Sequence, residues 1–255
     1  MSINLENVVL ASPEQMAFII QGMRNPMNSW EKSDSTFIEE DEYYDILGNS
    51  GPAVGEENRS ELGPDDLSLT QRLSNAGTEH RKYMRMMPVY VRITAPLYWW
   101  KEADTYKIGT VANSCSTMHK IAEKEFTLED FSCEHLLSDY SMEGELIYSN
   151  PNDIFTSKYI LQFTIDVLNH YRAKYLETKD KKYWWQMIQL LPSSYNQTRN
   201  VMMNYEVLAN IYRQRKNHKL DEWREFSKWV ETLPYSELIT HMKLDNEEEM
   251  NGRSN

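Results

Sequence analysis

The sequence predicts an α+β protein that is rich in helix and contains a few strands. Several segments repeat apolar residues at helical spacing, whereas residues 88–96 alternate with a period of two, which is typical of a half-buried strand. The 255 residues include sixteen tyrosines, seven tryptophans and fourteen methionines but only nine glycines, a mix that suits packed helices better than a glycine-rich sandwich. A chain of this length can bury a substantial core.

Composition also excludes several functional classes. The net charge of −12 argues against duplex nucleic acid as the main partner, because Lys and Arg carry phosphate binding, although a small anionic nucleotide needs only two or three local basic groups. No apolar run approaches the roughly 18 residues of a membrane helix, and the N-terminus lacks a signal pattern, so we expect no membrane partner and a cytoplasmic protein. The cysteines and histidines show no disulfide or zinc spacing, and no metal is expected.

The N-terminal quarter predicts a strand, a helix and a loop-rich excursion. Residues 3–10 are weakly patterned as a strand. The Ser-Pro-Glu sequence at 12–14 predicts a helix start, with a Ser cap, Pro at the first helical position and an acid near the positive end of the helix dipole. Residues 31–64 combine an acidic run at 39–42 with a stretch rich in Gly, Pro and Asn, which predicts a long loop with a solvated acidic face.

The remaining elements are mostly helices. In the strand at 88–96 the residues Val89, Val91 and Ile93 should share one side, and the strand should end at Pro96, which cannot donate a ladder hydrogen bond. Further helices are predicted at 64–85, at about 103–121, from the Thr127-x-x-Asp130 capping pattern onward, and at 154–177, 183–191, 198–215 and 220–233, before a frayed acidic tail at 241–255.

Two interpretations of the segment after the strand stay open. A strand that ends in a small, polar, Gly-containing segment is how many ligand sites are built. The alternative is a strand, an aromatic core plug at 97–100 and a capped helix, which the residue types favour. On the 198–215 helix, Asn204 and Arg215 would share one face, where burial costs free energy unless both are paired.

Three stretches together resemble the flavin-dependent thymidylate synthase family. They are SELGPDDLSLTQRLSNAG, VRITAPLYWWKEADTYKIGTVANSCS and LLPSSYNQTRNVMMNYEVLANIYRQRKNHKLDEWREF. Their order and spacing agree with the family over about 60–240, and the strand–helix start also fits. The resemblance implies one domain over residues 1–240, with an antiparallel sheet packed against helices.

The family's Arg-His-Arg, seven residues, Ser signature is absent. Counted from Pro96, the first three positions fall on Thr105, Tyr106 and Lys107, and the Ser falls on Cys115. The resemblance implies catalytic roles for Arg215 and Glu102, cofactor contacts from Thr105, Tyr106, Lys107, Asn113, Asn204 and Asn210, and substrate contacts from Ser114, Cys115, Ser116 and Arg215. Of these, Asn204, Asn210 and Arg215 match the family's residue types.

The family's phosphate-binding arginine before Leu-Pro falls on Ile188. Thr105 and Ile188 thus each stand where the family has an arginine. The loss of these two charged contacts removes roughly 3–6 kcal/mol of ligand binding. Nucleotide binding would then need substitutes such as Arg85, Arg92 or Lys101.

The implied reaction is reductive methylation of dUMP, with methylenetetrahydrofolate, FAD as the hydride donor and NADPH, in a homotetramer. Three hypotheses follow: an active flavin enzyme on a pyrimidine nucleotide, a catalytically silent binding or interaction protein, and a different chemistry at Cys115. The last rests on one thiol, and a thiol is more often a small buried hydrophobe than a nucleophile.

Overall fold

The computed structural model describes residues 3–38, 42–44, 50–52, 59–137, 147–150 and 153–241. The chain divides into two compact units. The first unit comprises residues 1–4, 93–105 and 113–200, and the second comprises 5–92, 106–112 and 201–255. One domain over 1–240 therefore stays a prediction, and the tail beyond residue 241 lies outside the described residues.

One four-stranded sheet runs through the described residues, in the order β1 (Asn4–Leu10), β6 (Pro88–Pro96), β10 (Asn196–Asn204) and β7 (Val111–Ser114). The alternation predicted for 88–96 is confirmed: Val89, Val91 and Ile93 are 0%, 2% and 1% exposed. The strand ends at Pro96, as expected for a residue without a backbone N–H. The predicted α+β class, rich in helix and with an antiparallel sheet, is confirmed.

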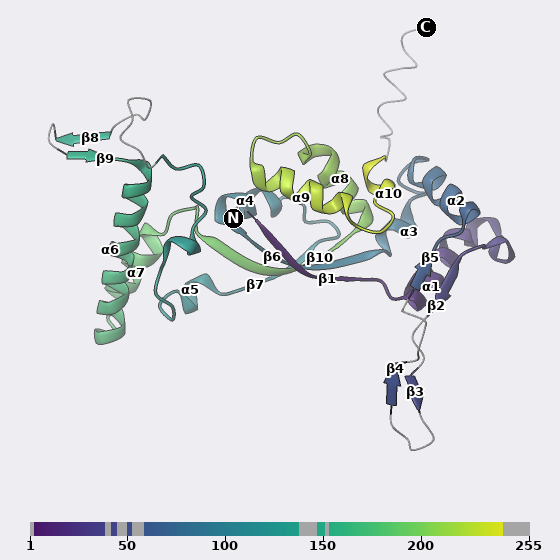
Figure 1. Cartoon of the computed structure of the whole chain (residues 1–255), viewed down its shortest axis with the longest axis horizontal. Coiled ribbons are helices and arrows are strands. Elements are labelled where there is room, and N and C mark those ends of the chain that lie inside the picture. The colour runs from purple at the N-terminus through teal and green to yellow at the C-terminus, as the bar shows by residue number, and fades with distance from the viewer. Residues whose placement is uncertain are drawn as a thin grey trace, which may run out of the picture. The chain divides into compact units, whose positions relative to one another are not determined.

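The second unit is mainly helical (Figure 1). Its helices are α1 (Pro13–Arg24), α2 (Pro64–Ser74), α3 (Lys82–Arg85), α8 (Tyr205–Arg215), α9 (Asp221–Glu231) and α10 (Glu237–Thr240), with 3₁₀ turns η1 (Asn25–Met27) and η2 (Trp30–Lys32). The predicted start of α1 is confirmed, because Ser12 and Gln15 form a reciprocal capping box. Helices α9 and α10 both pack against α8.

In the first unit, helices α6 (Ser157–Thr178) and α7 (Lys181–Leu190) pack against a core of aromatic and aliphatic side chains. The unit also contains α4 (Leu97–Ala103), α5 (Thr117–Lys120), the 3₁₀ turn η3 (Leu128–Asp130), β8 (Ile147–Asn150) and β9 (Asp153–Phe155). Helices α6 and α7 lie side by side (Figure 1). Between them Leu168 and Met187 are fully buried, in one cluster with Phe126 and Phe131.

The excursion at 31–64 contains more structure than the predicted loop. Strands β2 (Thr36–Ile38) and β5 (Arg59–Glu61) pair antiparallel, and so do β3 (Glu42–Tyr44) and β4 (Ser50–Pro52). Most of the acidic run, residues 39–41, lies outside the described residues.

Four helix predictions are wrong in whole or in part, and three of them lie between residues 64 and 137. The segment 103–121 instead contains the end of α4, strand β7 and the short α5. Helix α4 starts earlier, at Leu97, because the N–H groups of Leu97 and Tyr98 donate to the carbonyls of Tyr195 and Ser193. The capping pattern at Thr127 forms, with its N–H donating to Asp130, but only the turn η3 follows. The helix predicted at 64–85 ends at Ser74, before the separate α3.

The helix predicted at 198–215 begins only at Tyr205. Residues 196–204 form β10, in which Val201 and Met203 are buried on alternate positions. Asn204 then caps α8, because its Oδ1 accepts from the N–H of Val207 at 3.0 Å. Asn204 therefore does not share a helical face with Arg215 in the predicted way.

Candidate functional site

The predicted site residues divide between the two units. Glu102, Thr105, Asn113, Ser114, Cys115 and Ser116 belong to the first unit, and Tyr106, Lys107, Asn204, Asn210 and Arg215 belong to the second. Each group is built by a different part of the chain.

In the second unit, Arg215 is fixed against two aromatic rings. Its Nε donates to the Tyr106 hydroxyl at 2.8 Å, and its guanidinium carbon lies 5.6 Å from the centre of that ring. The same carbon lies 5.1 Å from the ring centre of Trp223, which is 1% exposed. Stacking of this kind suits the planar, permanently charged guanidinium. Arg215 is thus held in one orientation before any ligand binds.

A chain of hydrogen bonds extends from this arginine along α8. The Tyr106 hydroxyl donates to Oε1 of Gln214 at 2.9 Å, and Nε2 of Gln214 donates to Oδ1 of Asn210 at 2.9 Å. Oδ1 of Asn210 also accepts from Arg213 at 3.0 Å. The structure therefore joins three of the predicted residues, Tyr106, Asn210 and Arg215, into one polar cluster.

The position of Tyr106 depends on a close approach at Gly109. This glycine has a φ of +77°, and a Cβ there would lie 2.8 Å from Nδ2 of Asn204 and 2.8 Å from Val207. The segment 106–112 can therefore lie directly on the start of α8 only with glycine at this place. Asn204 is buried and serves as the α8 cap, while Lys107 is exposed.

In the first unit, a polar cluster surrounds Arg199, a residue that the sequence analysis did not single out. Its guanidinium carbon lies 4.1 Å from the ring centre of Trp100, its Nη1 donates to Asp104 at 2.7 Å, and its Nε donates to Gln197 at 3.0 Å. Nε2 of Gln197 in turn donates to the carbonyl of Cys115 at 3.1 Å and to the Thr117 hydroxyl at 2.8 Å. We call this group the Arg199 cluster.

The predicted substrate residues adjoin this cluster in sequence. Asn113, Ser114, Cys115 and Ser116 are all exposed. The N–H of Cys115 donates to the carbonyl of Thr198 at 2.9 Å, so its backbone is held while its thiol is accessible. The Ser116 hydroxyl accepts from the N–H of His119 and so caps α5.

Glu102 and Thr105 close the end of α4. Both the hydroxyl and the N–H of Thr105 donate to the Glu102 carbonyl, at 2.7 and 3.1 Å. These two hydrogen bonds fix the backbone of Glu102, which is half-buried.

Two of the basic residues considered as substitutes are already paired. Arg85 forms two hydrogen bonds with the carboxylate of Glu206, which raises the pKa of the arginine, and Nε of Arg92 lies 3.1 Å from Glu6. Ile188 packs against the core of the first unit, so the position where the resemblance expects a phosphate-binding arginine is part of the hydrophobic core. Arg199 is also paired, with Asp104, but that carboxylate is 54% exposed.

Among the residues that the structure describes, no three His, Cys, Asp or Glu side chains are grouped to hold a metal ion. Within the same residues, every helix is too short or too polar to cross a membrane.

The chain has the fold of the flavin-dependent thymidylate synthases. No protein-family model and no curated protein matches the sequence. The Helicobacter pylori flavin-dependent thymidylate synthase with FAD and dUMP has a TM-score of 0.58 at 15% identity, with 95% of this chain and 99% of that chain covered. The UMP/dUMP methylase PolB from Streptomyces cacaoi bound with 5-Br dUMP has a TM-score of 0.53 at 14% identity, covering 94% and 95%. These identities establish the fold.

Proposed function

We propose that the protein is a flavin-dependent methyltransferase of the thymidylate synthase type, acting on dUMP or a related pyrimidine nucleotide. The similar solved structures contain FAD and dUMP, or a brominated pyrimidine nucleotide, and match nearly the whole chain. The observation that carries the proposal is Arg215, which matches the family's residue and is held by Tyr106 and Trp223 in one orientation.

The residues present fit a flavin and a nucleotide phosphate. Arg199 and Arg215 are stacked guanidiniums that can give bidentate hydrogen bonds to phosphate or carbonyl oxygens. The exposed Ser114 and Ser116 add hydroxyl donors, and Glu102, Thr105, Lys107, Asn113, Asn204 and Asn210 are the further proposed contacts. Reduced FAD would supply a hydride, methylenetetrahydrofolate the one-carbon unit and NADPH the electrons.

The role of the chain itself is positioning and charge stabilisation. A guanidinium fixed over an aromatic ring does not have to reorient when charge develops on a pyrimidine carbonyl. It can therefore stabilise that charge without a free-energy cost of reorganisation. In this proposal Arg215 binds that carbonyl, and Tyr106 keeps the arginine in place through its hydroxyl. Arg199, in the first unit, is proposed separately as a phosphate contact.

Flavin binding tests the proposal directly. The purified protein is titrated with FAD, and binding is followed by the absorption of the flavin and the quenching of its fluorescence. We expect the wild type to bind FAD saturably, and we expect dUMP affinity, measured by calorimetry, to fall at least about tenfold in Arg215→Ala, the loss of roughly one charged hydrogen bond. Arg224→Ala, which removes an exposed side chain of α9, is the matched control and should bind as the wild type does. Absence of flavin binding by the wild type would refute the proposal.

A second candidate is a catalytically silent homologue that binds nucleotide or flavin, or a protein partner, without methyl transfer. Asp104 on Arg199 and Glu206 on Arg85 favour it, because each carboxylate occupies a cation that could otherwise bind phosphate. Tritium release from dUMP labelled at carbon 5 separates the two: an enzyme releases tritium in the presence of methylenetetrahydrofolate, FAD and NADPH, and a binding protein does not. The proposed homotetramer is tested by light scattering of the same preparation.

A further inference from the structure

A small pocket lies in the second unit, between the end of α1, the turn η2 and the first turns of α2. Its volume is about 320 Å³, and its polar lining comes from Arg24, Ser29, Lys32, Asp65, Ser68 and Arg72. None of the predicted flavin or nucleotide residues lines it. The pocket therefore needs an explanation of its own.

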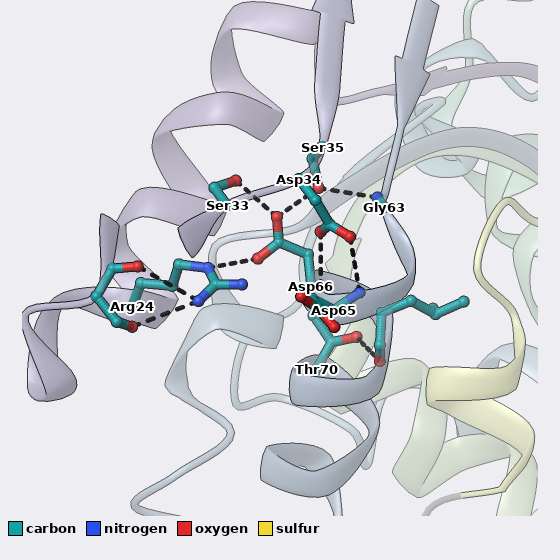
Figure 2. A network of polar contacts seen from close by, with 10 residues as sticks. Arg24, Ser33, Asp34, Ser35, Gly63, Asp65, Asp66 and Thr70 are labelled. Atoms are coloured by element: carbon teal, nitrogen blue, oxygen red, sulfur yellow. Dashed lines mark hydrogen bonds and ion pairs between the residues drawn. The ribbon is translucent and has the colours of Figure 1, made fainter. Parts of the chain in front are cut away.

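Arg24 is the most informative of these residues because it is charged and only 4% exposed. Its Nε donates to Asp66 at 2.6 Å, and its Nη1 donates to the carbonyl and hydroxyl of Ser29 at 3.3 and 3.4 Å. Nη2 forms no hydrogen bond with a described residue (Figure 2), but it is not among the buried side-chain atoms that lack a partner. A ligand oxygen in the pocket can accept a charge-assisted hydrogen bond from this guanidinium.

Two further cations approach the pocket from different elements. Lys32 is the last residue of η2. Arg72 lies on α2, on the same helical face as Asp65 and Ser68. Both Lys32 and Arg72 are exposed, and neither forms an ion pair with any described residue. Lys32 and Arg72 therefore bring positive charge to a pocket that also contains Asp65, in a chain with a net charge of −12.

The N-terminus of α2 is not the source of the site. Its first N–H groups, those of Asp65 and Asp66, donate to the carboxylate of Asp34 at 2.9 and 3.0 Å (Figure 2). The available donors are therefore the side chains of Arg24, Lys32 and Arg72 with the hydroxyls of Ser29 and Ser68. This donor set matches a tetrahedral oxyanion.

Asp65 limits what else the ligand can carry. Asp65 lines the same pocket, and an anionic residue there disfavours a ligand that is anionic on every side but can accept a hydrogen bond from a hydroxyl or amino group. We propose that this pocket binds the phosphate group of a small phosphate ester that also carries a hydroxyl or amino group. The site goes beyond the proposed methyltransferase function, because it does not depend on Arg199 or Arg215.

Calorimetric titration of the full-length protein tests the proposal, with inorganic phosphate and glycerol 3-phosphate as probes. The variant is the double substitution Lys32→Gln and Arg72→Gln, and the control is Lys174→Gln with Lys182→Gln on α6 and α7. Lys32, Arg72 and Lys182 are exposed and Lys174 is partly exposed, so folding should be preserved. We expect the wild type and the control to bind glycerol 3-phosphate, and the double variant to bind at least about tenfold more weakly. Binding should also weaken as salt rises.

FAD and dUMP contain phosphate as well, so FAD titration forms a second arm. If the double variant keeps its FAD affinity, the pocket serves a separate phosphate ester. If FAD affinity falls together with phosphate affinity, and FAD displaces phosphate, the phosphate in the pocket belongs to the cofactor. Failure of the wild type to bind either phosphate probe, or an unchanged affinity in the double variant, overturns the site. Failure of the methyltransferase proposal is read separately, from Arg215→Ala.

Discussion

Each unit contains an arginine–aspartate pair at nearly the same distance, but the two pairs differ in burial. In the second unit, Arg24 and Asp66 are 2.6 Å apart, with side chains 5% and 0% exposed. In the first unit, Arg199 and Asp104 are 2.7 Å apart, with side chains 13% and 54% exposed. The chemistry of the two pairs is the same, and the environment of the carboxylate differs.

The difference in burial gives the two pairs different roles. The Arg24–Asp66 pair stabilises the fold, whereas the Arg199–Asp104 pair can exchange its carboxylate for a ligand anion. Asp66 accepts from Arg24 and from the hydroxyls of Ser33 and Ser35, all at 2.6 Å, so its removal leaves a buried cation and two hydroxyls without their acceptor (Figure 2). Asp104 is mostly in water, where an ion pair adds little stability. A ligand anion can therefore replace Asp104 on Arg199 at low cost, whereas nothing replaces Asp66.

Removal of the buried carboxylate should have the largest effect. We expect Asp66→Ala to lower the free energy of unfolding by about 3–5 kcal/mol, because Arg24 stays buried without its partner. Urea unfolding followed by circular dichroism measures the loss. A decrease below about 1 kcal/mol would show that the pair is no more structural than a surface ion pair.

A crowded glycine beside the same pair should have the next largest effect. A Cβ on Gly63 would lie 2.2 Å from Cγ and 2.4 Å from the carbonyl oxygen of Asp34, the residue that accepts from the first N–H groups of α2. Gly63→Ala must displace Asp34, and we expect a loss of about 1–3 kcal/mol in urea unfolding.

Gly22→Ala is the matched control for that substitution. In α1 its Cβ would meet only the sulfur of Met86, at 4.0 Å, so alanine should be neutral or stabilising by up to about 1 kcal/mol. Equal losses at Gly22 and Gly63 would mean that contact with Asp34 does not matter.

Acid should weaken the buried pair more gently than deletion does. Burial alone would raise the pKa of Asp66, but hydrogen bonds from Ser33, Ser35 and Arg24 outweigh it and lower the pKa below the ordinary 3.8. The unfolded chain therefore takes up a proton at a higher pH than the folded chain. The stabilising contribution is complete above about pH 4 and is lost as the pH falls through the lowered pKa.

The wild type should then lose stability more steeply below pH 4 than Asp66→Asn does. Urea unfolding at several pH values between 5 and 2.5 measures the two slopes. Equal slopes would show that Asp66 has the same proton affinity in the folded and unfolded chain.

Elements with complete local signals were predictable from the sequence. The period of two at 88–96 and the Ser-Pro-Glu start at 12–14 lie within short windows, and both β6 and α1 form as expected. Residues 198–204 were not predictable in this way, because the helical spacing of 204–215 extends into them. They form a strand through tertiary pairing, for example of Thr198 with the N–H of Cys115.

The same reasoning explains what was predictable of the site. The resemblance singled out Tyr106 and Arg215, which are 109 positions apart, and the structure places them in hydrogen-bond contact. Arg199 was missed because its partner Asp104 is 95 positions away and its segment was assigned to a helix. Asp66 was missed for a similar reason, since its serine partners come from the excursion 31–33 positions earlier. A single sequence gives no signal for such pairs.

Disruption of the exposed Arg199–Asp104 pair should give the smallest change in stability, and its effect should instead appear in ligand binding. We expect Asp104→Ala to lower the free energy of unfolding by less than about 1 kcal/mol, because the carboxylate is 54% exposed. Arg199 would still be held by the ring of Trp100 and by Gln197, so its guanidinium would stay oriented while losing an internal competitor. If Arg199 binds phosphate, dUMP should bind Asp104→Ala more tightly than the wild type and Arg199→Ala more weakly, as measured by calorimetry. Unchanged dUMP affinity in both variants would place the nucleotide phosphate elsewhere and leave Arg199 with a packing role on Trp100.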